Sequence, residues 1–236
     1  MLPEIKLEFD AFIKFHLVIP LMSFLTLFLV LEFTQLDLWI SRHFYNAEFH
    51  QWPYKESLLA ETILHVGGQY FVYLSAIAML SCLLASQRSN SSIHCYRREL
   101  FFLLIASISG PIIIALLKSS THIYCPWSLA LFGGDKPYVR LFDYTAGNLQ
   151  IGHCFPAAHA GSGFTFISLY FFLMRVKPAY KLYGLYFGLV LGLAYGASQQ
   201  VRGAHFFSHD VVSLAVCWFL SLVLFILFFR KQFTWA

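Results

Sequence analysis

Long apolar stretches alternate with short polar ones along the chain. A helix needs roughly 17 to 25 apolar residues to cross the hydrocarbon core of a bilayer, and its backbone polar groups must bond within the segment. Six stretches approach that length: residues 15–34, 69–85, 100–117, 161–174, 182–197 and 211–229. The pattern therefore predicts an all-α, polytopic membrane protein whose six transmembrane helices form a bundle. The fourth stretch is short, which suggests that it begins inside a cavity.

The segment between the first two predicted helices, residues 35–68, mixes aromatic with polar side chains. Its aromatic residues include Trp39, Phe44, Tyr45, Phe49, Trp52 and Tyr54. This mixture is typical of an interfacial helical segment, and an ordinary structured loop is the alternative. Because neither a repeat nor a low-complexity linker interrupts the chain, the sequence predicts a single membrane domain over residues 1–236.

Composition and charge favour the bilayer as the main solvent. Hydrophobic residues make up 58% of the chain and charged residues 12%, whereas a soluble domain is roughly 25% charged. The net charge is +4, and no basic cluster resembles a nucleic-acid footprint. We therefore expect the bilayer, and no nucleic acid, as a partner.

Basic residues fall in every second connection, and lysine and arginine in short loops favour the cytoplasmic side. They precede the first helix and follow the second, fourth and sixth: Lys6, Lys14, Arg88, Arg97, Arg98, Arg175, Lys177, Lys181, Arg230 and Lys231. This distribution predicts that both termini are cytoplasmic. Residues 35–68, 118–160 and 198–210 then face outward.

Titratable residues concentrate in the last two outward segments, 118–160 and 198–210. They are Lys118, His122, His153, His159, Arg202, His205, His209 and Asp210. Ionisable groups at the ends of membrane helices are costly unless paired, so they are functional candidates. Lys118 alone is explained as a lysine that extends to the interface. His159, which opens a helix rich in small residues, is harder to explain by packing.

A metal site is one interpretation of His205 and His209. They lie four residues apart, so they share a face if the segment is helical, and such a pair can bind zinc. At least one more ligand is needed, from His153, His159 or Asp210. Because no His-Glu-x-x-His pattern is present, the sequence favours chemistry without a metal or other cofactor.

The motifs in these segments resemble the type 2 phosphatidic acid phosphatase superfamily of membrane lipid phosphatases. Its signature has three parts: lysine, six residues and Arg-Pro; Pro-Ser-Gly-His; and Ser-Arg, five residues, His, three residues and Asp. In this chain Lys118 is followed after six residues by Cys125 and Pro126. The second part reads Pro156-Ala157-Ala158-His159, and the third reads Ser198-Gln199, five residues and His205. The resemblance covers roughly residues 100–236.

Four positions depart from the signature: Cys125 and Gln199 replace arginine, Ala157 replaces serine, and His209 replaces aspartate. Arg202, about one helical turn beyond Gln199, and Asp210, adjacent to His209, are the nearest substitutes. Arg140 is a further candidate donor. The surrounding stretches look similar to a bacterial branch of the superfamily that diverges in the same places.

The resemblance implies a mechanism through a phosphohistidine. His205 would attack phosphorus, and His159 would protonate the leaving lipid oxygen. Asp210 or His209 would orient His205, while Lys118, Arg202 and Arg140 would bind the phosphate. The implied activity is hydrolysis of a phosphomonoester or diphosphate of an envelope lipid. Its place would be the periplasmic side of a bacterial inner membrane.

Cys125 and Cys154 lie in one outward segment, which would face an oxidising compartment, so we expect a disulfide between them. Two other functions stay open. One is a lipid-to-lipid phosphotransferase that uses the same phosphohistidine. The other is a catalytically silent lipid-binding or transport protein, which the missing arginines and serine favour. Phosphatidic acid, phosphatidylglycerol phosphate, a prenyl diphosphate and lipid A are all candidate ligands.

Overall fold

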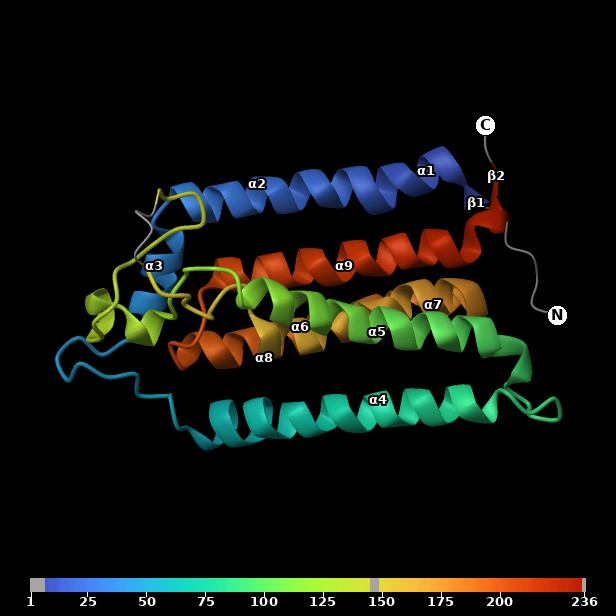
Figure 1. Ribbon diagram of the computed structural model, residues 1–236, viewed down its shortest axis with the longest axis horizontal. Helices are drawn as coiled ribbons and strands as arrows, with labels where there is room; N and C mark the ends of the chain where they lie inside the picture. The colour runs from blue at the N-terminus through green and yellow to red at the C-terminus, as the bar shows by residue number, and fades with distance from the viewer. Residues whose placement is uncertain (1–6, 145–148, 235–236) are drawn as a thin grey trace.

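Helical rods that lie side by side along one direction form the body of the protein (Figure 1). The computed structural model describes residues 7–144 and 149–234, and Lys6 and residues 145–148, which belong to predicted loops, lie outside this range. The first rod joins α1 (Phe9–Ile13), the π-helix η1 (Lys14–Val18) and α2 (Ile19–Phe33). The second joins the π-helix η2 (Leu58–Gly67) to α4 (Gly68–Ala85).

The remaining rods come from the second half of the sequence. They are α5 (Arg97–Lys118); α6 (Ala158–Phe164) continued by η6 (Thr165–Ile167) and α7 (Ser168–Val176); α8 (Lys181–Val201); and α9 (Phe207–Phe229). Short elements complete the described chain: β1 (Leu7–Glu8), α3 (Leu36–Arg42), η3 (His94–Tyr96), η4 (Pro126–Ser128), η5 (Ala130–Phe132), η7 (Pro178–Tyr180), η8 (Arg230–Gln232) and β2 (Phe233–Thr234).

Four helical segments of the described chain are long and apolar enough to cross a membrane. They are Phe9–Phe33, Leu58–Ala85, His94–Lys118 and Phe207–Gln232. The helical fold is confirmed, and these four segments are candidate membrane spans at four of the predicted crossings. The other two, in the rods of α6–α7 and α8, stay predictions. The same holds for an interfacial segment within residues 35–68, where α3 is a helix of 7 residues.

The two ends of the described chain meet at one end of the bundle. β1 pairs in parallel with β2, with Leu7 opposite Phe233. Figure 1 shows the connection between α4 and α5 at this same end, and α3 with the long loop before α6 at the other. This arrangement agrees with an even number of crossings. That the end with the termini is cytoplasmic remains a prediction from the basic residues.

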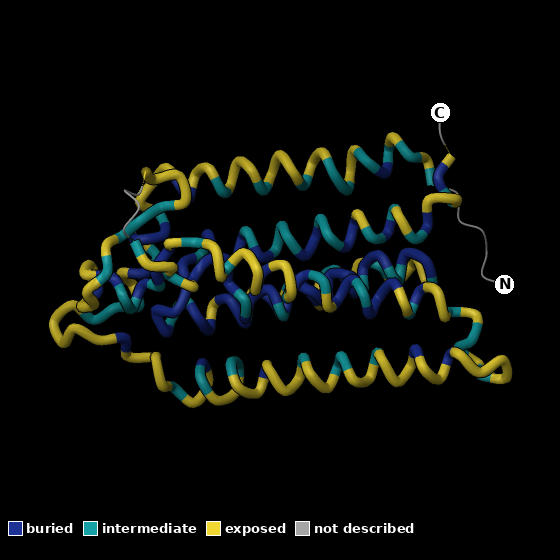
Figure 2. The backbone as a smooth tube through the Cα atoms, viewed as in Figure 1, coloured by how far each residue is buried: buried dark blue, intermediate teal, exposed yellow. Residues whose placement is uncertain are grey.

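The outer rods expose their apolar side chains, while the central rods bury theirs. Figure 2 shows α2 and α4 largely exposed and the centre of the bundle buried. The core is built on aromatic side chains from α5, α7 and α9, among them Phe102, Phe171, Phe225 and Phe229. Lipid tails are as apolar as these side chains, so exposed apolar faces on α2 and α4 are what a bilayer would cover.

Pro111 interrupts the hydrogen bonding of α5, and a neighbouring helix compensates. Proline lacks an N–H, so the carbonyl of Ser107, four residues earlier, loses its helical partner. The Thr165 hydroxyl donates to that carbonyl over 2.5 Å, and the Ser107 and Ser168 hydroxyls are 3.0 Å apart. A freed backbone group in a membrane must find such a partner. The replacement attaches α5 to the rod that carries His159.

Glycines on α8 allow the α6–α7 rod to approach at backbone distance. Gly184, Gly188, Gly192 and Gly196 recur every four residues and therefore share one face. A Cβ on Gly163 would lie 2.7 Å from the Cα of Gly192, and a Cβ on Gly192 would overlap the Phe164 ring. Side chains larger than hydrogen cannot occupy this contact without separating the helices.

We predict that Gly192→Ala destabilises the fold, because the new methyl group overlaps Phe164 in a tightly packed region. Overpacking of this kind typically costs about 1–3 kcal/mol. Thermal unfolding of purified protein in detergent measures the effect. Gly67→Ala is the matched control, since its Cβ would make an ordinary 3.4 Å contact. Equal melting temperatures for the two variants would contradict the proposed packing.

Candidate active site

A cavity of about 540 Å³ lies between the ends of α4, α5, α6 and α8, at the end of the bundle opposite the termini. Its lining includes His65, Lys118, His153, His159, Arg202 and His205. These residues come from both segments that the sequence singled out, 118–160 and 198–210, and from the π-helix η2. Two histidines 46 positions apart in sequence, His159 and His205, therefore face one space.

His159 is fixed at the start of α6 by two contacts. Its ring stacks on Tyr195 with centroids 4.5 Å apart, and its Nε2 lies 3.0 Å from the Leu64 carbonyl oxygen. A carbonyl only accepts, so Nε2 carries the proton and donates it. In the neutral ring the lone pair is then on Nδ1, and Nδ1 is the atom able to take up a proton.

His205 lies in the turn between α8 and α9 and is 6% exposed. Its Nδ1 is 3.3 Å from Nδ1 of His209, in the first turn of α9. When His205 Nδ1 is the donor in this contact, its Nε2 holds a free lone pair. Burial, together with the neighbouring His209, lowers the pKa of His205 well below its ordinary value. The ring is therefore neutral, as a nucleophile must be.

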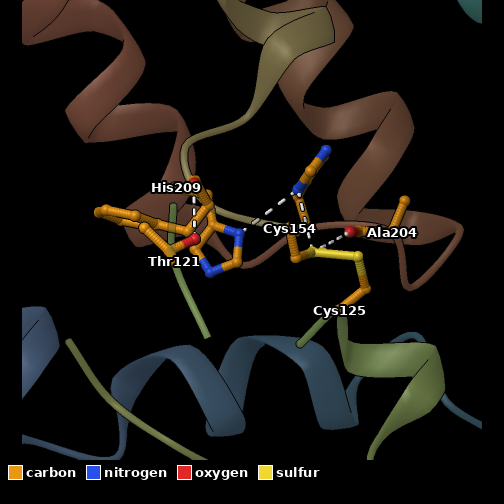
Figure 3. Close-up of a disulfide and its surroundings, with 7 residues drawn as sticks. Thr121, Cys125, Cys154, Ala204 and His209 are labelled. Atoms are coloured by element: carbon orange, nitrogen blue, oxygen red, sulfur yellow. Dashed lines mark hydrogen bonds between the residues drawn. A yellow bond between two sulfur atoms is a disulfide. The ribbon is translucent and has the colours of Figure 1, made fainter. Parts of the chain in front are cut away.

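The Cys125–Cys154 disulfide packs against the same turn (Figure 3). Its Cys154 sulfur lies 3.5 Å from His205 Nδ1 and 3.1 Å from the Ala204 carbonyl oxygen. The bond joins the loop after α5 to the loop before α6 and places both beside His205. Figure 3 shows His209 and Thr121 on the side of Cys154 that is opposite Ala204.

The start of α9 is capped by a carboxylate from a distant element. Asp37 of α3 is 4% exposed, and its Oδ1 accepts the backbone N–H of Ser208 over 3.0 Å. Such a contact satisfies one of the free N–H groups at the start of a helix. Burial raises the pKa of Asp37 to about 6. The cap fixes the turn of α9 that presents His209 to His205.

Asp210, expected as an alternative partner of His205, lies elsewhere. Its Oδ2 accepts from Gln200 Nε2 over 2.6 Å, and its carboxylate packs against Gly196 on α8. One residue along α9 turns the side chain by about 100°, so His209 faces the His205 turn and Asp210 faces α8. The contact with His205 is thus made by His209.

The three expected phosphate-binding cations differ in their surroundings. Lys118 lines the cavity and has no hydrogen-bond or ion-pair partner among the described residues. Arg202 also lines it, but each of its three nitrogens has a protein partner: the Lys55 carbonyl, Gln199 Oε1 and the Glu61 carboxylate. Arg140 lies at a separate cavity together with His122. The structure therefore brings Lys118 and Arg202 together with the histidines and leaves Arg140 apart.

The residues considered for a metal site are not gathered around one point. In the described part of the chain, the group of three potential ligands within 4.8 Å of one another is Cys125, Cys154 and His205. Two of these ligand atoms are joined in the disulfide. His153, His159 and Asp210 do not complete such a group with His205 and His209.

The sequence interpretation, which began the second helix at residue 69, missed the cavity residue His65 and Glu61, the ion-pair partner of Arg202. The structure begins it at Leu58, where Ser57 caps the first turn by accepting from Ala60 N over 3.2 Å. This π-helix brings Glu61 to Arg202 and places the His65 ring 4.7 Å from that of His159. Ser57 before an apolar run was the available signal.

Comparisons with known proteins agree with these motifs. The PAP2 superfamily matches residues 99–233. The lipid A 4'-phosphatase of Francisella tularensis subsp. novicida (strain U112) is 27% identical over 225 residues, which cover 93% of this chain and 98% of that protein. No solved structure matches the chain.

We predict that the contribution of His205 to stability is lost as the pH falls. The unfolded chain protonates this ring near pH 6.5, whereas the folded chain does not. Unfolding is therefore favoured progressively below that pH, by up to about 1.4 kcal/mol for each pH unit. Unfolding of wild type and His205→Asn, followed from about pH 7.5 to about 5.5, measures this. As the pH falls, the free energy of unfolding of wild type should decrease more than that of the variant. A constant difference would contradict the prediction.

Proposed function

Because the chain belongs to the PAP2 superfamily, we propose that it is a phosphatase of phosphorylated envelope lipids that works through a phosphohistidine. The observation that carries this proposal is the convergence of His159, His205 and Lys118 on one cavity. Two imidazoles and a cation suffice for the required steps, which are nucleophilic attack, proton transfer and charge stabilisation. No step needs a metal ion or another cofactor.

In the first step, His205 Nε2 forms a bond to phosphorus while the bond from phosphorus to the lipid oxygen breaks. Donation from His205 Nδ1 toward His209 keeps the lone pair on Nε2. The leaving oxygen takes the proton from Nδ1 of protonated His159 and departs as an alcohol. Nε2 of His159 stays bonded to the Leu64 carbonyl, which keeps Nδ1 as the transferring atom.

In the second step, water attacks the phosphohistidine. His159 Nδ1, now holding a lone pair, accepts a proton from this water, and the bond between His205 Nε2 and phosphorus breaks. Inorganic phosphate leaves, and both rings return to their starting states. Lys118, which lacks a protein partner among the described residues, supplies positive charge to the phosphate oxygens. Arg202 supports it from its bonded position.

The shape of the cavity supports a lipid substrate. Besides the polar groups, Val72 and Tyr73 of α4 and Pro111 of α5 line it. All three belong to segments that are long enough to cross a membrane. A phosphate at His205 therefore lies beside apolar walls that reach toward the bilayer, where acyl chains would extend. A water-soluble phosphate ester would not need such walls.

The relative named lipid A 4'-phosphatase makes a phosphorylated glycolipid of the lipid A type the first substrate to test. We place the reaction on the outward, periplasmic side of the inner membrane, with both termini cytoplasmic, because the basic connections lie at the opposite end of the bundle from the cavity. The oxidising compartment outside the membrane also suits the disulfide beside His205.

We predict that purified protein releases inorganic phosphate from lipid A and that His205→Ala loses at least about 10³-fold in rate, because the nucleophile is gone. His159→Ala should lose about 10²–10⁴-fold. Phosphate release in detergent, measured with and without a chelator, and with phosphatidic acid and a prenyl diphosphate as parallel substrates, tests both variants.

His43→Ala is the matched control, since His43 is exposed directly after α3 and its Nδ1 bonds the Trp39 carbonyl. Full activity of His205→Ala would refute the nucleophile, and loss of wild-type activity with chelator would refute the metal-independent mechanism. Phosphate that appears on an added lipid instead of in water would identify a phosphotransferase. Binding of lipid without turnover by wild type would identify a silent binding protein.

A further inference from the structure

We propose that His65 is a third imidazole of the reaction site and binds the phosphate directly. This inference rests on the proposed function, because it assigns a ligand to the same cavity. His65 comes from η2, outside the residues 99–233 that match the superfamily. Its ring lines the cavity and meets the ring of His159 edge-on, with centroids 4.7 Å apart at 75°.

The Nδ1 atom of His65 has no hydrogen-bond partner in the described chain, although it is buried. A buried polar atom without a partner costs free energy, so native structures satisfy nearly all of them. His159 next to it is satisfied by the Leu64 carbonyl, and Arg202 by three protein groups. An anion in the cavity would supply the partner that the protein does not provide.

The site is also short of groups that bind phosphate. Cys125 and Gln199 stand where the signature has arginines, and the ion pair with Glu61 offsets the charge of Arg202. His65 lines the cavity together with Lys118 and Arg202. An N–H from His65 would replace one of the missing donors.

The π-helix η2 explains how one segment contacts both Arg202 and His159. Glu61 and His65 are four residues apart, and the wide turn of a π-helix keeps residues at that spacing on nearly the same face. Glu61 reaches Arg202 while His65 reaches His159. Single π-helical turns are often found at functional sites. The segment thus orders two sides of the pocket at once.

Inhibition of lipid hydrolysis by inorganic phosphate tests this assignment. His65→Ala should raise the inhibition constant of phosphate at least about tenfold, because one donor to the oxyanion is lost. His65→Asn, whose amide can reach close to the position of Nδ1, should recover part of the loss. Val66→Ala is the matched control, because Val66 follows on the same helix and is 37% exposed; its inhibition constant should equal that of wild type.

An inhibition constant in His65→Ala within about twofold of wild type, or an equal rise in Val66→Ala, would overturn the assignment. Direct calorimetric titration of phosphate into each variant separates this result from failure of the proposed function. If wild type binds phosphate through His65 but hydrolyses no lipid, the assignment stands and the proposed function fails. If wild type hydrolyses lipid but His65→Ala binds phosphate as tightly as wild type does, the proposed function stands and the assignment of His65 fails.

Discussion

The backbone contact between α6 and α8 is the constraint on which the cavity depends. Gly163 and Gly192 meet so closely that a methyl group on either would collide with the other helix. In a bilayer, helices associate through packing and hydrogen bonds because lipid tails already solvate apolar side chains. This contact lets His159 stack on Tyr195 and reach the Leu64 carbonyl. A wider separation would remove His159 from the space that it shares with His205.

A second set of constraints fixes His205, and its members come from distant parts of the chain. Asp37 caps the start of α9, the disulfide holds two loops against the turn, and Gly203 adopts a φ of 76° that suits glycine. Trp52 packs where a Cβ on Gly203 would lie. These contacts hold the turn that carries His205, while Lys118 remains without a protein partner among the described residues.

The sequence predicted the elements that depend on local patterns. Runs of apolar residues located the helices, four of which are confirmed as long enough to cross a membrane, and the motif around Lys118, His159 and His205 led to the confirmed superfamily. The roles of these residues in catalysis stay predictions. The first part of the second helix, Leu58–Gly67, was missed because its polar residues, Glu61 and His65, interrupt the apolar run. Their partners, Arg202 and His159, lie far away in sequence.

The most direct test of the account is to trap the covalent intermediate. Wild-type protein mixed with lipid A labelled in its phosphate and quenched within one turnover should carry label that is stable to base and lost in acid, as expected for a phosphohistidine. Peptide mapping should place it on His205, and His205→Ala should carry no label. Label on another residue, or turnover without any labelled protein, would contradict the central claim that His205 is the nucleophile.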